Sequence, residues 1–400
     1  MGDTLPQGWR RIKFGEIIAS SVYGTSVSSQ NGGNTPIVGM GQLQDGKVIL
    51  KNLERVPLSD NERQKLSLKR GDLLFNRTNS EALVGKIGIV LEDAEAVFAS
   101  YLVRFRVKED SASPDYVNFI FNLPKIQKAL SRFITKGVSQ CNVNPTKLCK
   151  ELDILLPPLE EQRKLVSLIK FWNETTDQLQ SLLERKREYK RALMQRLLDV
   201  RFNDNEHWKE YHLGDLFKER VDTRHLDLPL LSITREKGVI PRGDVERKDT
   251  SNEDKSKYLR ICVGDIGYNT MRMWQGVSAL SSLEGIVSPA YTILIPSDKV
   301  DGQFAAYLFK YTPVVHLFQR YSQGLTSDTW NLKYPHFAEI KVHIPPLPEQ
   351  RKIAAVLSAA DREIDQLTQK LDAYKQQKKG LMQQLLTGKK RVKLDHKEAA

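Results

Sequence analysis

Two stretches of the sequence are nearly the same: PPLEEQRKLVSLI at residues 157–169 and PPLPEQRKIAAVL at residues 345–357. The likeness extends beyond these motifs, because 17 of the 42 residues at 157–198 are identical to the residue found 188 positions later. A chance similarity would not keep one register over that length. The chain therefore contains an internal repeat, around which the rest of the sequence is organised.

Each copy of the repeat has the pattern of one long helix. Prolines stand at its start, acidic residues occupy the first turn, and Gly388 is the predicted C-cap of the second copy. Apolar side chains recur every seven residues, which is typical of a coiled-coil seam. A helix of about 40 residues is roughly 60 Å long and cannot bury its own apolar stripe, so each rod is predicted to pair with its duplicate. The seam is predicted at Leu165, Trp172, Leu179 and Leu193, with Leu168, Leu182 and Tyr189 at the intermediate spacing and Lys186 as an interruption, and at Ile353, Ala360, Leu367, Tyr374 and Leu381 in the second copy.

The regions that precede the rods also resemble each other, although less strictly. QGWRRIKFGEI at 7–17 corresponds to EHWKEYHLGDL at 206–216, and RGDLLFNRT at 70–78 corresponds to VGDIGYNTM at 263–271. In each region short β-rich runs come first and helical stretches follow, which is typical of an α+β unit. The predicted organisation is a first globule at 1–155, a first rod at 156–203, a second globule at 204–343, and a second rod with a basic tail at 344–400.

Composition narrows the class of protein. A chain of 400 residues with 40% hydrophobic content can form two or more domains. Its three cysteines have neither CxxC spacing nor an even number, so neither a disulfide scaffold nor a cysteine zinc site is indicated. The N-terminus lacks an apolar signal core and no stretch approaches the ~18 apolar residues of a membrane helix, so we expect a cytoplasmic protein. The net charge of +12 favours an acidic partner such as nucleic acid.

Two variable globules that alternate with two near-identical helices, each introduced by PPLxEQRK, resemble the specificity subunit of type I restriction–modification systems. The resemblance implies that the globules are target-recognition domains that each read one half of a split DNA site, and that the rods form an antiparallel coiled coil that sets the distance between the halves. It also implies two methyltransferase (modification) subunits that methylate adenine N6 with S-adenosylmethionine, and restriction subunits that complete an ATP-dependent, Mg²⁺-requiring nuclease. With twofold symmetry, the half-site centres are expected about one DNA turn (~34–36 Å) or a multiple apart.

The sequence also lacks the motifs of catalytic subunits. It contains no GxxxxGK[ST] phosphate loop, no [DNS]PP[YFW] tetrapeptide of an amino-methyltransferase and no HExxH metal motif. The chain itself is therefore expected to be non-catalytic and to hold no cofactor. One enzymatic alternative is a metal-dependent nuclease built from Asp227, Glu246 and Lys248. The competing interpretation is a solvated charge cluster, and the absence of these residues from the first globule favours it.

Base-edge contacts are expected from polar side chains on loops that can enter a groove. In each globule one candidate segment follows a β-rich run and a second is a glycine-bearing loop before the final strand. The alternative for such a segment is an ordinary polar turn that does not contact DNA. Trp274 in the second globule is interpreted as a core or platform residue and not as a wedge between bases. The candidates are Asn76, Arg77, Thr78, Asn79, Ser80, Lys136, Ser139, Gln140 and Asn142 in the first globule, and Asn269, Arg272, Gln275, Arg320, Gln323, Thr326 and Ser327 in the second.

Charge is unevenly divided between the globules. Residues 1–155 carry 21 basic and 16 acidic side chains, whereas residues 204–343 carry 18 and 19. Phosphate contacts dominate the affinity and salt dependence of DNA binding, so the two globules are expected to grip the backbone unequally. Docked methyltransferase subunits could supply part of that grip.

The charged start of each rod has the same four residues, EQRK, in both copies. Helix capping accounts for the acidic residues there, but not for the retained glutamine, arginine and lysine. We interpret these positions as docking sites for equivalent partner subunits or for the adjacent globules. A DNA-binding regulator without a methyltransferase and a coiled-coil protein adaptor remain as alternatives. The docking positions are Glu161, Gln162, Arg163 and Lys164, with Glu349, Gln350, Arg351 and Lys352 in the second rod.

Overall fold

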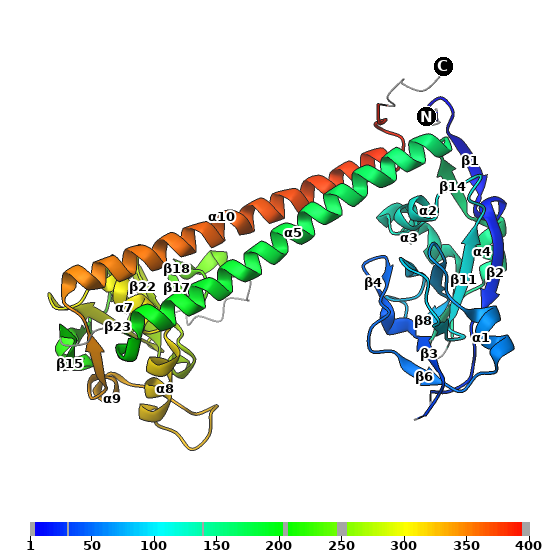
Figure 1. The fold of residues 1–400 in the computed structure, drawn as a ribbon. Helices are drawn as coiled ribbons and strands as arrows, with labels where there is room; N and C mark the ends of the chain where they lie inside the picture. The colour runs from blue at the N-terminus through cyan, green and yellow to red at the C-terminus, as the bar shows by residue number, and fades with distance from the viewer. Residues whose placement is uncertain (1–4, 30–31, 138–139, 203–206, 246–253, 394–400) are drawn as a thin grey trace. The chain divides into compact units, whose positions relative to one another are not determined.

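A computed structural model describes residues 5–29, 32–137, 140–202, 207–245 and 254–393 (Figure 1). The chain divides into two compact units. Unit 1 comprises Met1–Gln178 and Leu371–Ala400, and unit 2 comprises Leu179–Lys370. Each unit therefore contains one globule and part of each rod.

Unit 1 is an α+β domain in which most strands precede the main helices, as the sequence predicts. Its sheets have the strand orders β2-β11-β7-β9-β5-β4, β10-β3-β6, β12-β13-β8 and β1-β14. The strands are β1 Arg10–Lys13, β2 Ile18–Tyr23, β3 Thr35–Val38, β4 Leu43–Gln44, β5 Lys47–Val48, β6 Glu54–Val56, β7 Leu73–Asn76, β8 Thr78–Asn79, β9 Ile87–Ile89, β10 Val97–Phe98, β11 Leu102–Val107, β12 Ile134–Lys136, β13 Cys141–Val143 and β14 Asp153–Leu156. The α-helices of this globule are α1 Asp60–Leu66, α2 Pro114–Phe121, α3 Pro124–Leu130 and α4 Pro145–Glu151.

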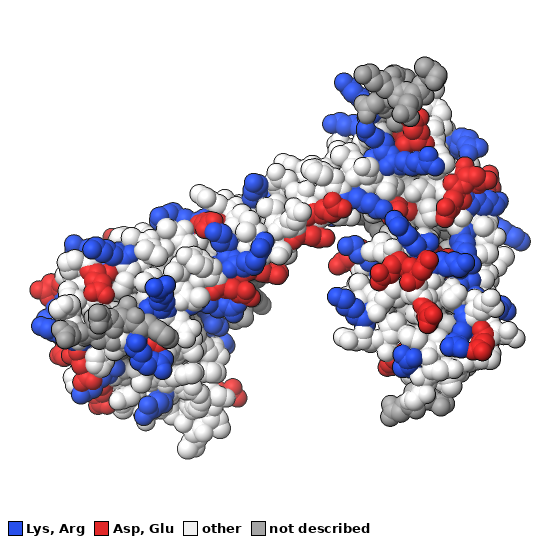
Figure 2. All heavy atoms as spheres, in the orientation of Figure 1, with Lys and Arg blue, Asp and Glu red and all other residues white. Residues whose placement is uncertain are grey.

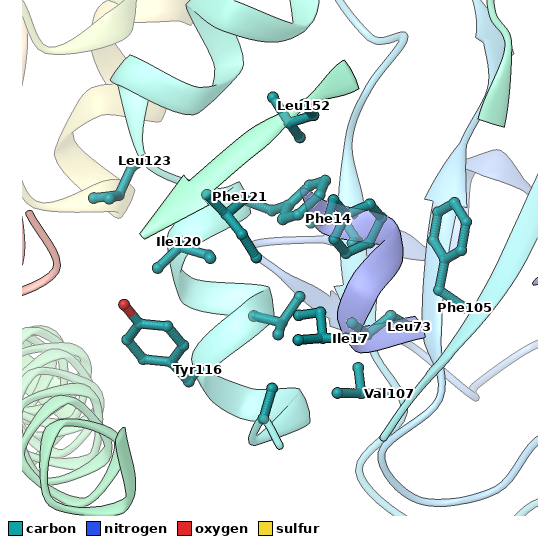
Figure 3. Close-up of a cluster of buried hydrophobic side chains, with 14 of the residues drawn as sticks. Phe14, Ile17, Leu73, Phe105, Val107, Tyr116, Ile120, Phe121, Leu123 and Leu152 are labelled. Carbon is teal, nitrogen blue, oxygen red and sulfur yellow. The ribbon is translucent and has the colours of Figure 1, made fainter. Parts of the chain in front are cut away.

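The core of unit 1 joins the central sheet to the helices that follow it. Phe14, from the 3-10 helix after β1, packs against Phe105 of β11 at 5.2 Å and Phe121 of α2 at 4.6 Å between ring centroids (Figure 3). The same cluster includes Leu165 of the first rod and Leu385 of the second. The rod ends are thus part of the globule's hydrophobic core, and this burial holds them in place.

Unit 2 repeats the plan, with fewer strands among its described residues. Its sheets have the orders β16-β23-β20-β21, β15-β24, β17-β18 and β19-β22. The strands are β15 Lys209–His212, β16 Phe217–Glu219, β17 Leu231–Thr234, β18 Gly238–Pro241, β19 Leu259–Ile261, β20 Ile266–Asn269, β21 Ser278–Leu280, β22 Gly285–Val287, β23 Tyr291–Pro296 and β24 Lys341–Ile344. The helices of this globule are α6 Leu213–Leu216, α7 Gly302–Leu308, α8 Thr312–Tyr321 and α9 Tyr334–Ala338.

The two rods are the helices α5 (Leu159–Leu198) and α10 (Leu347–Leu385). Each begins directly after its proline pair, where the backbone N–H of the first-turn glutamine donates to the second proline's carbonyl at 3.0–3.1 Å. At the end of α10 the chain turns at Gly388, whose φ of +73° is left-handed and whose N–H donates to the Leu385 carbonyl at 3.2 Å. A Cβ at this position would lie 2.9 Å from Pro6, so a side chain would be strained there and would also clash.

Within each unit the two helices run antiparallel and pair as a coiled coil. In unit 1 the predicted seam residues Trp172 and Tyr374 meet with ring centroids 5.5 Å apart. In unit 2, Lys186 forms an ion pair with Glu363 at 2.7 Å. The lysine that interrupts the apolar series therefore has a partner on the opposite helix.

One predicted seam position lies outside the seam, because Tyr189 is exposed. Leu182 is partly buried, as are the seam residues Trp172 and Leu179, and its neighbour Leu183 is buried. The seam drifts because an undistorted α-helix with 3.6 residues per turn does not keep a strict seven-residue repeat on one face.

Candidate DNA-recognition surfaces

In the first globule a small sheet brings the two candidate segments together. Strand β13 pairs on one side with β12 and on the other with β8, so that Thr78 faces Asn142 across the ladder. The Val143 N–H donates to the Arg77 carbonyl at 2.8 Å. Two segments about 60 residues apart in sequence thus form one surface.

The side chains of the first segment differ in accessibility. Asn76 is 1% exposed, and its Oδ1 accepts no hydrogen bond from the described residues. The Arg77 guanidinium lies over the Tyr23 ring, 5.3 Å from its centroid. Asn79 donates to the Met40 sulfur at 3.3 Å, and Ser80 is exposed. Ser80 and the partly exposed Arg77 and Asn79 can reach a ligand in this arrangement, whereas Asn76 is enclosed by the globule.

The second segment extends the same surface. The Thr78 hydroxyl donates to Asn142 Oδ1 at 2.5 Å, which orients the amide. Lys136 is exposed and forms an ion pair with Glu81 at 2.8 Å, and the hydrogen bond with Glu81 raises the pKa of the ammonium group. Gln140 is exposed, and Ser139 lies outside the described residues.

A cleft that the sequence analysis missed adjoins these residues. Its volume is 550 Å³, and it is lined on one side by Met40, which contacts Asn79, and on another by Ser100, whose carbonyl accepts from Arg77 at 3.5 Å. The signal in the sequence is the hydroxyl-rich stretch GTSVSS at 24–29. Other polar residues that line the cleft are Thr25, Ser26, Ser28, Ser29, Gln42, Asn52, Glu54 and Tyr101.

The second globule repeats this juxtaposition with different side chains. The Leu332 N–H donates to the Thr270 carbonyl at 2.9 Å, at the positions that correspond to Val143 and Arg77. Trp274 and Trp330 add an edge-to-face contact between the two segments, with ring centroids 5.2 Å apart. Trp274 is half-buried and its indole N–H donates to the Met271 carbonyl at 3.1 Å, so it supports the surface from below.

The other candidates of the second globule lie around this contact. Asn269 accepts from the Met271 N–H at 3.0 Å and so shapes the turn after β20. Gln275 is partly exposed in the 3-10 helix Met273–Gln275. Arg272, Arg320 at the end of α8, Gln323, Thr326 and Ser327 are exposed.

Some charged side chains in both globules pair with each other inside their own globule. Asp72 accepts from Arg106 at 2.7 and 3.1 Å and lies 3.8 Å from Arg104. Asp265 similarly accepts from Arg220 at 2.7 and 3.0 Å. Burial lowers the pKa of Arg104, whereas the hydrogen bonds with the aspartates raise the pKa of Arg106 and Arg220. Over the face in view, basic and acidic side chains are interspersed (Figure 2), so net charge alone does not locate the phosphate contacts.

The acidic residue at each rod start ties the rod to its own globule. Glu161 accepts from the Trp9 indole at 3.2 Å and from the Arg391 guanidinium at 2.7 and 3.2 Å. Glu349 accepts from the Trp208 indole at 3.1 Å. The tryptophans at corresponding positions of the two globules thus have the same role.

The glutamine that follows each of these glutamates is the same in both copies of the repeat because it binds backbone groups inside its own unit. Gln162 and Gln350 are fully buried. Gln162 accepts from the Ser113 N–H and donates to the Pro157 carbonyl, each at 2.8 Å. Gln350 accepts from the Asp301 N–H at 2.8 Å and donates to its own proline carbonyl at 2.7 Å. Of the predicted docking residues, Arg163, Lys164, Arg351 and Lys352 are exposed, and partner docking stays a prediction for them.

The comparisons with known proteins agree with this duplicated geometry. The sequence model of the type I restriction modification DNA specificity domain matches residues 6–185 and again residues 205–374. The chain belongs to this family. Among curated family members, it is 25% identical to the putative type I restriction enzyme MjaX specificity subunit of Methanocaldococcus jannaschii, over 97% of this chain and 95% of that relative. The MjaVIII specificity subunit of the same organism is 23% identical, over 98% and 95%.

Solved specificity subunits share the fold. The HsdS subunit from Thermoanaerobacter tengcongensis has a TM-score of 0.52 at 16% identity, covering 97% of this chain and 98% of that one. The type I restriction-modification S subunit from M. genitalium has a TM-score of 0.58 at 14% identity, covering 98% of each chain. Two recognition domains and an antiparallel helix pair are therefore the architecture of this family member.

The structure does not test the nuclease alternative. Two of its three residues, Glu246 and Lys248, lie outside the described residues. Among the residues that the structure describes, no group of three or more His, Cys, Asp or Glu is placed to hold a metal ion. The described helices also include none that is long and apolar enough to cross a membrane.

Proposed function

We propose that this chain is the specificity subunit of a type I restriction–modification complex, and that it recognises a bipartite, gapped DNA site. The observation that carries the proposal is the duplicated surface. Val143–Arg77 in one unit and Leu332–Thr270 in the other make the same backbone hydrogen bond between the same two segments. The polar side chains on those segments differ, so the two units have one framework and two different reading surfaces.

The proposal assigns catalysis to partners. Two methyltransferase subunits would bind the chain and methylate adenine N6 within the recognised site, and restriction subunits would add cleavage. S-adenosylmethionine, ATP and Mg²⁺ would be held by those subunits, and the present chain would be non-catalytic. Because the substrate is cellular DNA, the complex would act in the cytoplasm. The family to which the chain belongs and the names of its relatives support this assignment.

Genome-wide adenine-methylation mapping tests the proposal. The chain is expressed with the methyltransferase encoded beside it, and the methylated motifs are compared with those of cells that have the methyltransferase alone. A split motif that requires the chain is the expected result. Methylation that is identical in both strains would overturn the proposal in favour of a stand-alone regulator or an adaptor.

Two loop variants assign one half-site to each globule. Replacing the second-globule loop 322–331 with a glycine–serine loop of equal length should abolish methylation at the wild-type motif by removing recognition of one half. Replacing residues 135–142 of the first globule in the same way should remove recognition of the other half. In each variant, co-purification of the methyltransferase serves as the control for folding and assembly.

A further inference from the structure

The described residues include one large apolar side chain that is completely exposed. Leu325 has a relative exposure of 101%, the highest among the large hydrophobic residues in that part of the chain. It lies in the loop 322–331, which follows α8 (gold in Figure 1) and belongs to the second recognition surface. A single exposed leucine is ordinary on a protein surface. Evidence for a binding role of Leu325 therefore has to come from the structure of its loop.

The loop is closed by its own hydrogen bonds. Gln323 and Asn331 exchange two backbone hydrogen bonds, at 2.9 and 2.8 Å. Inside this bridge the Thr329 N–H donates to the Thr326 carbonyl at 2.9 Å, and the Thr326 N–H donates to the Thr329 hydroxyl at 3.1 Å. The leucine is therefore presented by a hydrogen-bonded turn.

The residue before the leucine makes this presentation possible. Gly324 has a φ of +136°, and a Cβ there would lie 2.6 Å from the Thr329 carbonyl oxygen. Only glycine fits such a close backbone approach. The loop of the first globule has the same order of residue types, with Gly137-Val138-Ser139 corresponding to Gly324-Leu325-Thr326. An aliphatic residue directly after the glycine is thus a shared feature of both recognition loops.

The residues around the leucine are suited to contact with the edge of a base. Trp330 in the same loop packs on Trp274, which anchors the loop to the first candidate segment. Arg320 precedes the loop, Gln323 lies within it, and both are exposed, so hydrogen-bonding groups lie beside the apolar one. The single charged residue of the loop is Asp328, which is exposed. A loop whose one charge is negative is unsuited to phosphate contact, whereas the major groove offers the C5-methyl group of a pyrimidine as an apolar partner.

We propose that Leu325 is a specificity-determining residue that reads the C5-methyl group of one pyrimidine in the second half-site. The inference rests on the proposed function, because it presupposes that the second globule contacts the major groove. Thymine carries this methyl group in ordinary DNA, and 5-methylcytosine carries the same group. Burying one methyl group against the leucine should contribute about a fourfold gain in affinity.

DNA duplexes that lose or gain one C5-methyl group test this proposal. The assembled complex with its methyltransferase is titrated with duplexes in which each thymine of the second half-site, on either strand, is replaced by uracil, and each cytosine by 5-methylcytosine. Every base pair has one pyrimidine, so every position is probed. The wild-type complex should change affinity about fourfold at one position, and Leu325→Ala should be insensitive to the methyl group at that position.

Two controls separate the alternatives. Val263 is 67% exposed in the turn before β20, at the opposite end of that strand from Asn269, and Val263→Ala should keep the wild-type methyl sensitivity. If Leu325→Ala weakens binding equally with and without the methyl group, the leucine acts as a wedge or a general contact, and the proposal is overturned.

The proposal is also overturned if Leu325→Ala keeps the wild-type response to the methyl group, or if no position of the second half-site responds to it in the wild-type complex. Failure of the complex to bind any specific duplex would instead contradict the proposed function. The two failures are therefore distinguishable.

Discussion

Replacing Gln350 with leucine tests how the second rod is attached to its globule. Leucine has a similar volume, so the substitution removes the amide with little change in packing. The amide accepts from the Asp301 N–H at 2.8 Å and donates to the Lys299 carbonyl at 3.0 Å and the Pro345 carbonyl at 2.7 Å. All three partners would lose this hydrogen bond at a residue that is fully buried.

The expected cost follows from these three groups. A buried backbone group that loses its partner costs about 1–3 kcal/mol, and carbonyls lie at the lower end because they can accept a second bond. Three groups at about 1 kcal/mol each give about 3 kcal/mol of local stability. This corresponds to roughly a 100-fold increase in the opening equilibrium of the rod start.

Hydrogen-exchange mass spectrometry measures this opening separately in each unit. Peptides that cover 299–301 and 345–350 should exchange about 100-fold faster in Gln350→Leu, while peptides of unit 1 keep their protection. Gln162→Leu should give the converse result, because its amide binds Ser113 and Pro157 in unit 1. Arg351→Leu, on the exposed side of the same helical turn, is the matched control and should shift stability by less than about 0.5 kcal/mol.

Two outcomes would refute this reasoning. Unchanged exchange in Gln350→Leu would mean that water or a relaxed backbone satisfies the three groups. Equal acceleration in both units would mean that the units open together and that the attachment is not local.

Three further predictions concern docking, spacing and pH. Replacing Arg163 and Arg351 together with alanine should reduce co-purification of the methyltransferase severalfold without lowering the unfolding temperature, and an unchanged yield would contradict the docking role. Lengthening both rods by one matched heptad adds about 10 Å of helix, about three base pairs of DNA at ~3.4 Å each, so methylation mapping should find a changed spacer with the same half-sites; altered half-sites with the old spacer would refute the ruler. The hydrogen bond from Arg201 holds the pKa of the buried Asp199 carboxylate well below its usual range, so this carboxylate contributes stability above its unfolded pKa of about 4 and loses it as the pH falls through the lower folded value. The stability difference between wild type and Asp199→Asn should therefore be full at pH 6 and shrink below about pH 4, and a difference in urea midpoint that stays constant down to pH 2 would refute the assignment.

The repeat made the architecture predictable from sequence. A heptad pattern and a proline-led helix start are local features, so residues near one another in the chain carry the whole signal. The rods α5 and α10 begin at Leu159 and Leu347, close to where the motif places them. The predicted seam residues Trp172 and Tyr374 meet between the rods for the same reason.

The recognition surfaces were predictable only in part. The sequence indicated that two polar segments in each globule are candidates, but not that Asn142 would pair with Thr78 or that Asn76 would be buried. The cleft beside Met40 was missed, because its lining comes from several loops. Burial and pairing of this kind depend on contacts between residues far apart in the chain, for which a single sequence has no periodic signal.

The duplicated plan, the two long helices and the family can thus be predicted from the residues alone, because the repeat preserves residue types at fixed spacing. The roles of the repeated glutamate and glutamine become clear only in the folded chain. Glu161 and Gln162 point into their own unit and satisfy buried donors and acceptors there, while Arg163 is left exposed. The pattern EQRK identifies polar residues at a helix start, but the direction in which each one points follows from how the helix packs on its globule, since burying a polar side chain requires a matching partner from elsewhere in the chain.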